Sequence, residues 1–142
     1  MPILQGEPTA PLRVSAPTQA GGKIYATIEW MVDVSEYLDA GGRSPFGEWR
    51  SRLNAEARRK VSIALYRVGL GNFSNVKGVG AGVFECRIHF GPGYRVYFGK
   101  DGEEIVILLG GGTKQRQQND VQIAQERWQD YKLKTREQKQ EE

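Results

Sequence analysis

The residues Val83–Phe98 read VFECRIHFGPGYRVYF, and this stretch decides the fold more than any other part of the chain. Apolar and polar side chains alternate with a period of two on both sides of Gly91–Gly93, a pattern typical of two strands joined by a turn. The apolar positions that share one face are Phe84, Cys86, Ile88, Val96 and Phe98. The hairpin therefore predicts a sheet with one face packed on a core and a second, polar face.

The register of this hairpin predicts which side chains meet on the polar face. A three-residue turn sets His89 opposite Arg95. Two positions further from the turn, Arg87 then lies opposite Tyr97. Two cations and an imidazole on one face repel each other unless an anion lies between them. A phosphodiester suits that arrangement, because guanidinium groups hold phosphate oxygens with paired donors.

The remaining pattern places further elements around the hairpin. Because the strands are grouped rather than alternating with helices, we expect an α+β fold with helices packed on a twisted, mainly antiparallel sheet. The expected elements are extended segments within Lys23–Leu38, a helix capped by Ser44 and begun by Pro45, a second helix from Asn54 to Gly69, a loop over Gly71–Gly82, a strand over Ile105–Leu109 ended by Gly110–Gly112, and a last helix over Lys114–Lys132.

Length and composition limit the class of protein. A chain of 142 residues suits one domain, which we expect over 23–133, after a flexible extension at 1–22 that is rich in proline and glycine and before a charged tail at 134–142. One cysteine and one histidine exclude an internal disulfide and make a dedicated metal site improbable, and we expect no cofactor. No apolar run is long enough to span a membrane and no secretory signal is visible, so we expect a cytoplasmic protein.

The net charge of +3 hides an uneven distribution. Residues 43–100 hold eleven basic and three acidic side chains, whereas the segments on either side are acidic. This basic block contains the expected helix pair and the hairpin. It indicates where an RNA or an acidic partner would bind.

Cleavage of RNA by its own 2′-hydroxyl needs the residue types that this face gathers. Histidine is suited to move a proton near neutral pH, and arginine stabilises the charge that develops on the phosphate. Tyr97 would donate a hydrogen bond or stack on a base. Weaker candidates for phosphate contact are Lys114 and Arg116 at the start of the last helix and Lys77 in the glycine-rich loop. The alternative interpretation of all these positions is a solvated polar surface.

Two motifs resemble a known family. RIHFGPGYRVYF at Arg87–Phe98, followed by LLGGGTK at Leu108–Lys114, is similar to HigB-like addiction-module killer proteins of the RelE/ParE toxin superfamily. EYLDAGGRSPFGEW at Glu36–Trp49 resembles the entry to the first helix of that family. The resemblance covers 32–132 and implies a RelE-like α+β toxin, neutralised by an antitoxin with a HigA-like helix-turn-helix domain. RelE-like and HigB-like members cut mRNA on the ribosome without a metal.

The resemblance also implies roles for individual residues. Arg95 matches the arginine that acts on the scissile phosphate in RelE-like nucleases. Arg87 and His89 match basic or acid–base positions, and Lys114 matches a basic position at the start of the last helix. The sequence departs from the family where some members carry a catalytic tyrosine or histidine in the last helix, since this chain has Gln115, Gln117, Gln118 and Val121 there. Either Tyr97 takes over that role or catalysis is weaker.

Two rival functions remain open from the sequence. ParE-like members of the superfamily inhibit DNA gyrase and lack the nuclease residues, so the presence of Arg87, His89 and Arg95 favours the nuclease. A toxin-derived binding module without toxicity is the second rival, and the N-terminal extension motivates it. Packing of that extension over the polar face would favour the binding module.

Overall fold

The computed structural model describes residues 18–20, 23–25, 33–103 and 105–141. Most of the expected extension at 1–22 therefore lies outside the described residues, as does any packing of it over the sheet. At its end, β1 (Thr18–Ala20) pairs in antiparallel fashion with β2 (Lys23–Tyr25), which follows the extension, in a small two-stranded sheet. No helix of the described residues is both long and apolar enough to cross a membrane.

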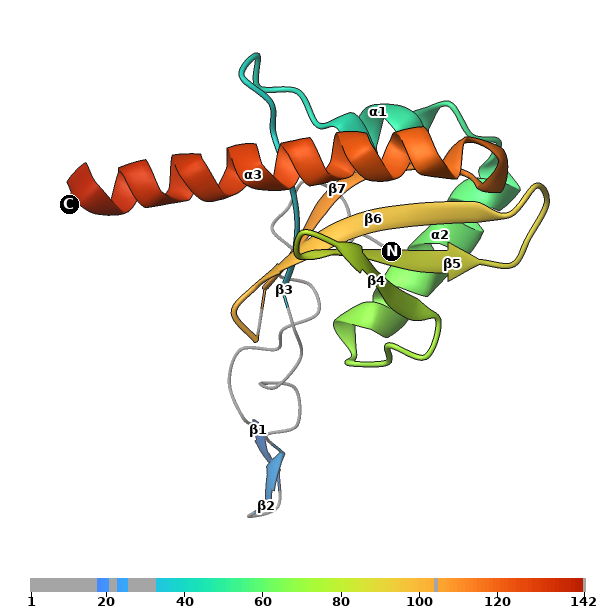
Figure 1. Cartoon of the computed structure of the whole chain (residues 1–142). Helices are drawn as coiled ribbons and strands as arrows, with labels where there is room; N and C mark the ends of the chain where they lie inside the picture. Colours follow the sequence, from blue (N-terminus) through green and yellow to red (C-terminus); the bar gives the residue numbers. More distant parts are fainter. Residues whose placement is uncertain (1–17, 21–22, 26–32, 104, 142) are drawn as a thin grey trace.

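A five-stranded sheet forms the centre of the molecule (Figure 1). Its strand order is β3-β7-β6-β5-β4, in which β3 runs parallel to β7 and every other neighbouring pair is antiparallel. The bounds are β3 Asp33–Glu36, β4 Val76–Gly80, β5 Val83–Ile88, β6 Tyr94–Asp101 and β7 Ile105–Thr113. The expected α+β class with a mainly antiparallel sheet is confirmed.

Helices α1 (Pro45–Ser51) and α2 (Ala55–Gly69) begin where their capping residues predict. The Ser44 hydroxyl accepts a hydrogen bond from the Gly47 N–H at 2.9 Å, and the Asn54 side-chain oxygen accepts one from the Ala57 N–H at 2.8 Å. Each cap satisfies a backbone N–H that has no partner inside its helix.

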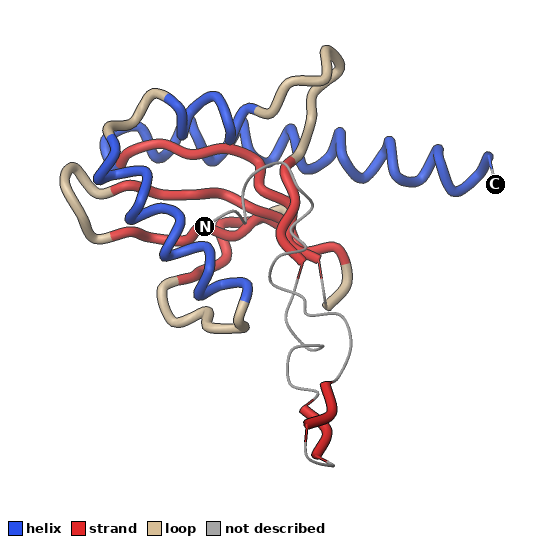
Figure 2. The backbone as a smooth tube through the Cα atoms, turned by 180° about the vertical axis from the view of Figure 1, so that it is seen from behind, coloured by secondary structure: helices blue, strands red, loops and turns tan. Residues whose placement is uncertain are grey.

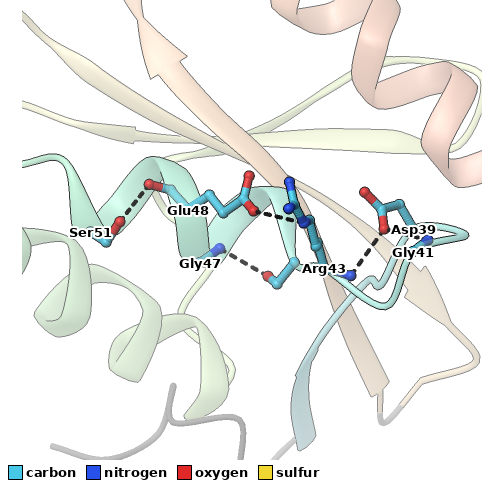
Figure 3. Close-up of polar contacts among 7 residues, drawn as sticks. Asp39, Gly41, Arg43, Gly47, Glu48 and Ser51 are labelled. Carbon is cyan, nitrogen blue, oxygen red and sulfur yellow. Dashed lines mark hydrogen bonds and ion pairs between the residues drawn. The ribbon is translucent and has the colours of Figure 1, made fainter.

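The loop that leads into α1 is held by its own polar side chains (Figure 3). One carboxylate oxygen of Asp39 accepts hydrogen bonds from the backbone N–H groups of Gly41 and Arg43, both at 2.9 Å. Arg43 in turn lies 3.9 Å from the Glu48 carboxylate in the first turn of the helix. These contacts hold the loop between β3 and α1 in one conformation.

Helices cover the two faces of the sheet in separate layers (Figure 2). The layer under α1 and α2 is apolar, and its buried residues are Val34, Phe46, Val61, Leu65, Val68, Cys86, Ile88, Val96, Phe98, Val106 and Leu108. The layer under the last helix, α3, is smaller, and its buried residues are Tyr37, Val83, Tyr97, Ile107, Leu109, Ala124 and Trp128. Both the predicted core face of the hairpin and its period of two are confirmed.

The C-terminal part of the chain differs from the expected one. A short 3₁₀ turn, η3 (Lys114–Arg116), leads into α3, which extends over Gln117–Glu141 and projects beyond the sheet (Figure 1). The residues 134–141, expected as a tail, are therefore helical. They contain neither glycine nor proline and consist mainly of good helix formers, and Lys134 pairs with Asp130 one turn earlier at 3.0 Å.

Two glycine-rich segments are strands. The first was expected to be a loop, and the second was expected to end a strand. β4 occupies Val76–Gly80, within the expected loop, and pairs with β5 as an edge strand interrupted by a register shift between Gly78 and Gly80. Gly110–Gly112 lie inside β7 because they pair with β6, and they are glycines because side chains of other elements rest directly on their backbone. A Cβ at Gly111 would overlap the Trp49 indole, and one at Gly112 would overlap the Asp120 carboxylate.

Candidate functional site

A buried carboxylate binds the charged side chains on the sheet face that α3 covers. Glu85 on β5 has no exposed surface, and its Oε2 accepts hydrogen bonds from Arg87 Nε and from Arg95 Nη1, both at 3.3 Å. Its other oxygen, Oε1, accepts one from Gln117 Nε2 of α3 at 2.7 Å. Three donors thus surround one carboxylate, which allows its charge to be buried.

The two arginines of this cluster differ in exposure. They are direct partners in the ladder, Arg87 on β5 opposite Arg95 on β6. The Arg95 side chain is 11% exposed, whereas that of Arg87 is 40% exposed. Arg95 is therefore held in a mostly buried position by its hydrogen bond to Glu85, and Arg87 extends towards solvent. The Nε of Arg95 is buried and has no hydrogen-bond partner among the described residues.

The expected register of the hairpin is wrong by two positions. The strands end at Ile88 and resume at Tyr94, which lie opposite each other, so the connection takes five residues rather than three. His89 consequently lies exposed at the start of the turn instead of opposite Arg95. Alternation fixes the face of each strand residue but leaves the pairing to the length of the turn.

Four of the sequence-predicted residues nevertheless line one cleft of about 530 Å³. They are Arg87, His89, Arg95 and Lys114, and the turn at Gly91–Gly93 and the apolar side chains beside it complete the lining. The Lys114 backbone N–H donates to the Gly93 carbonyl at 2.9 Å, which ties the start of η3 to the turn. We call this hollow the basic cleft.

Three other predicted residues lie outside the basic cleft. Tyr97 has no exposed surface and packs with Ala124 and Trp128 beneath α3, so it does not reach the cleft in this structure. Lys77 lies exposed on β4, directly opposite Glu85 and hence on the same face of the sheet. Arg116 lines a different cavity, on the other side of η3.

Of the backbone N–H groups that were expected to hold a phosphate at the start of the last helix, that of Lys114 is not free. The glycines continue the ladder with β6, and the Lys114 N–H is already bonded to the Gly93 carbonyl. Any contribution of Lys114 to anion binding therefore comes from its exposed side chain.

Glu85 and Gln117 are the members of the site that sequence reasoning missed. Alternation places Glu85 on the polar face, but the anion between the arginines was expected to be a bound phosphodiester. The protein supplies that anion itself. The signal was a carboxylate two positions from Arg87 on the same strand face; nothing in the sequence shows that Gln117 reaches it.

Other titratable groups near the sheet are kept neutral by burial. Burial raises the pKa of the Cys86 thiol to about 11, and the nearby Glu85 charge adds to that effect. Burial also raises the pKa of the Tyr97 hydroxyl, with further contributions from Glu85 and Asp120. Within the described residues, no three His, Cys, Asp or Glu side chains are grouped so as to hold a metal ion.

Comparison with known proteins gives one informative relative. A protein of Haemophilus influenzae, described as uncharacterized, is 42% identical to this chain over 80 residues, which are 56% of this chain and 81% of the Haemophilus protein. The chain belongs to the same family as that protein. No family model matches the chain.

Proposed function

We propose that this protein is the toxin of a type II toxin–antitoxin system and acts as a ribosome-dependent mRNA endonuclease. The observation that carries the proposal is the basic cleft, in which Arg87, His89, Arg95 and Lys114 lie together. The sequence resemblance to HigB-like members of the RelE/ParE superfamily names the same four positions. The α+β architecture, with a mainly antiparallel sheet between helices, is consistent with a RelE-like toxin fold.

In the proposed reaction the 2′-oxygen of the RNA bonds to the adjacent phosphorus while the bond from phosphorus to the 5′-oxygen breaks. The products are a 2′,3′-cyclic phosphate and a 5′-hydroxyl. His89 takes the proton of the 2′-hydroxyl while water gives a proton to the leaving 5′-oxygen, or water takes the first proton and His89 gives the second. Arg95 stabilises the negative charge that develops on the phosphate.

The arginines are suited to this task because Glu85 holds them in place. Arg95 donates to Glu85 through Nη1 at 3.3 Å, which leaves its Nη2 for a phosphate, whereas its Nε is buried. Arg87 is bound to the same carboxylate through Nε, so its terminal nitrogens remain available at the exposed end of the cleft. Lys114 adds a third cation on the opposite rim. Because these side chains are already held in place before the substrate binds, less conformational entropy is lost on binding.

The proposed partners follow from the same function. We propose a cognate antitoxin with a HigA-like helix-turn-helix domain, mRNA on the ribosome as substrate, and a cytoplasmic location. The excess of basic residues over 43–100 would attract both an acidic antitoxin segment and RNA.

Induced expression of single variants tests this proposal. Arg95→Ala and His89→Ala are compared with the parent and with Arg136→Ala, which removes an exposed arginine of α3 outside the basic block and outside the cleft. Growth and the 5′ ends of translated transcripts are measured. We expect arrest and new mRNA ends with the parent and with Arg136→Ala, and neither with the two cleft variants.

Two results would contradict the proposal. If both cleft variants arrest growth and cleave mRNA like the parent, the site is elsewhere. If the parent arrests growth with intact mRNA and gyrase-dependent DNA breaks, the protein is a ParE-like gyrase inhibitor instead.

A further inference from the structure

A second cavity, of about 350 Å³, lies on the other side of η3 from the basic cleft. It arises because β3 pairs with β7 only as far as Leu108, whereas β7 continues to Thr113. The end of β7 is thereby left between α1 on one side and α3 on the other. The side chains that matter for its chemistry are Trp49, Arg52, Tyr97, Arg116, Asp120 and Arg127.

The cavity carries an excess of positive charge. Three guanidinium groups line it against one carboxylate, that of Asp120. Arg127 is fixed, since its Nη1 donates to the Leu109 carbonyl at 2.9 Å. Within the described part of the chain, the guanidinium groups of Arg52 and Arg116 form neither a hydrogen bond nor a salt bridge. Burial raises the pKa of Asp120, although Arg116 and Arg127 act to lower it.

An unpaired donor adds a second, independent observation. The Tyr97 hydroxyl is buried and has no hydrogen-bond partner in the structure, although buried hydroxyl groups are normally bonded. The Tyr97 ring belongs to the wall of the cavity, opposite Gly110 of β7. Since burial raises the pKa of this hydroxyl, it remains a neutral donor and suits an oxygen acceptor.

We propose that this cavity binds a mononucleotide, with its phosphate between Arg116 and Arg127 and its base against the Trp49 indole. The volume lies in the range of small-ligand sites. Trp49 is half-buried, packs on Gly111 and presents an aromatic surface to the cavity, on which a planar base stacks. Arg52 lies beside it for a second polar contact. None of these residues lines the basic cleft, so the inference stands apart from the proposed function.

The purified full-length chain is titrated calorimetrically with AMP, and with adenosine and inorganic phosphate in separate arms. Tyr97→Phe removes only the unpaired hydroxyl, and Arg116→Gln removes one guanidinium. Arg59→Gln on α2 is the matched control, and circular dichroism checks the fold of each variant. We expect one AMP per chain, weaker binding of adenosine and of phosphate alone, an affinity for AMP at least about fivefold lower in both cavity variants, and no change in the control.

A further arm separates the two sources of a nucleotide. A trinucleotide RNA that displaces AMP and binds more tightly identifies a nucleotide of an RNA chain as the occupant, whereas AMP bound alone identifies a free nucleotide; both support the site. The proposal is overturned if AMP binds with a Kd above about 1 mM. It is also overturned if Lys114→Gln weakens AMP binding while the cavity variants do not, because the nucleotide then occupies the basic cleft. Neither result depends on ribosomes or growth, so failure here leaves the proposed endonuclease standing.

Discussion

The two faces of the central sheet bury different kinds of side chain. The face under α1 and α2 buries mainly apolar side chains, among them Phe46, Phe98 and Leu65, each with no exposed surface, together with Ser62 of α2. The face under α3 is apolar near Trp128 but buries a glutamate and most of an arginine near η3. Burial of apolar area stabilises a fold directly, whereas buried charges at best offset the loss of their hydration.

Because of this difference, one face contributes mainly to stability and the other mainly to the proposed function. The apolar face holds the strands together and has no charged side chain among its buried core residues. The polar face holds Arg87 and Arg95 in fixed positions at the expense of stability, which is typical of functional sites. Variants on the two faces should therefore affect different measurements.

The largest effect on stability is expected on the apolar face. Phe98→Ala removes a fully buried ring that stacks on Phe84 at 5.6 Å between centroids and packs near Phe73. We expect the free energy of unfolding to fall by about 3–5 kcal/mol, measured by urea denaturation. A loss below about 1 kcal/mol would mean that this face is not the main source of stability.

A slightly smaller loss is expected on the polar face. Glu85→Ala leaves Arg95 with a buried, uncompensated charge, and we expect about 3 kcal/mol of destabilisation. The double variant Glu85→Ala with Arg95→Met should recover part of this loss, because the unpaired charge is then absent. If the double variant is less stable than the single one, the carboxylate contributes by packing rather than by neutralising Arg95.

Alkaline pH introduces a charge on the apolar face. The pKa of Cys86 is raised from its ordinary value of 9.0 to about 11, so the unfolded chain loses this proton first. Stability is then complete below pH 9 and falls as pH rises towards 11, by up to about 1.4 kcal/mol per pH unit. Urea denaturation at each pH measures this slope, and Cys86→Val should reduce it. An unchanged slope in that variant would assign the effect to tyrosines such as Tyr37, whose pKa is raised to about 12.

The smallest effect on stability is expected at Arg87, the most exposed of the charged residues around Glu85. Arg87→Ala removes a side chain that is 40% exposed and pairs with Glu85 through one nitrogen, so we expect a loss below about 1 kcal/mol. The same substitution should weaken binding of RNA oligonucleotides, measured by filter retention. A variant that is clearly unstable yet binds RNA normally would reverse the proposed division between the faces.

Local signals in the sequence predicted much of the fold. Ser44 and Asn54 mark both helix starts because their side chains satisfy specific backbone donors. The period of two places Arg87 and Arg95 on the same face, and the structure agrees. Such features depend on residues close together in the chain.

The features that were missed depend on distant partners. Gly110–Gly112 resemble a strand end, yet they are strand residues on which Trp49 and Asp120 rest. The register of the hairpin depended on the length of one turn, and His89 was misplaced with it. Tyr97 faces the expected side of the sheet, but only the presence of α3 shows that it is buried there.

The part of β7 beyond Leu108 has a consequence for self-association, because β3 does not pair with it. Unpaired strand edges promote aggregation when further copies of a protein pair with them. Here Leu109, Gly110 and Gly112 are buried between α1 and α3, and Arg52, Arg116 and Arg127 line the cavity beside them. A second copy would bring three more guanidinium groups against these arginines, so we expect their charge to oppose edge-to-edge pairing and a phosphate bound among them to weaken that opposition.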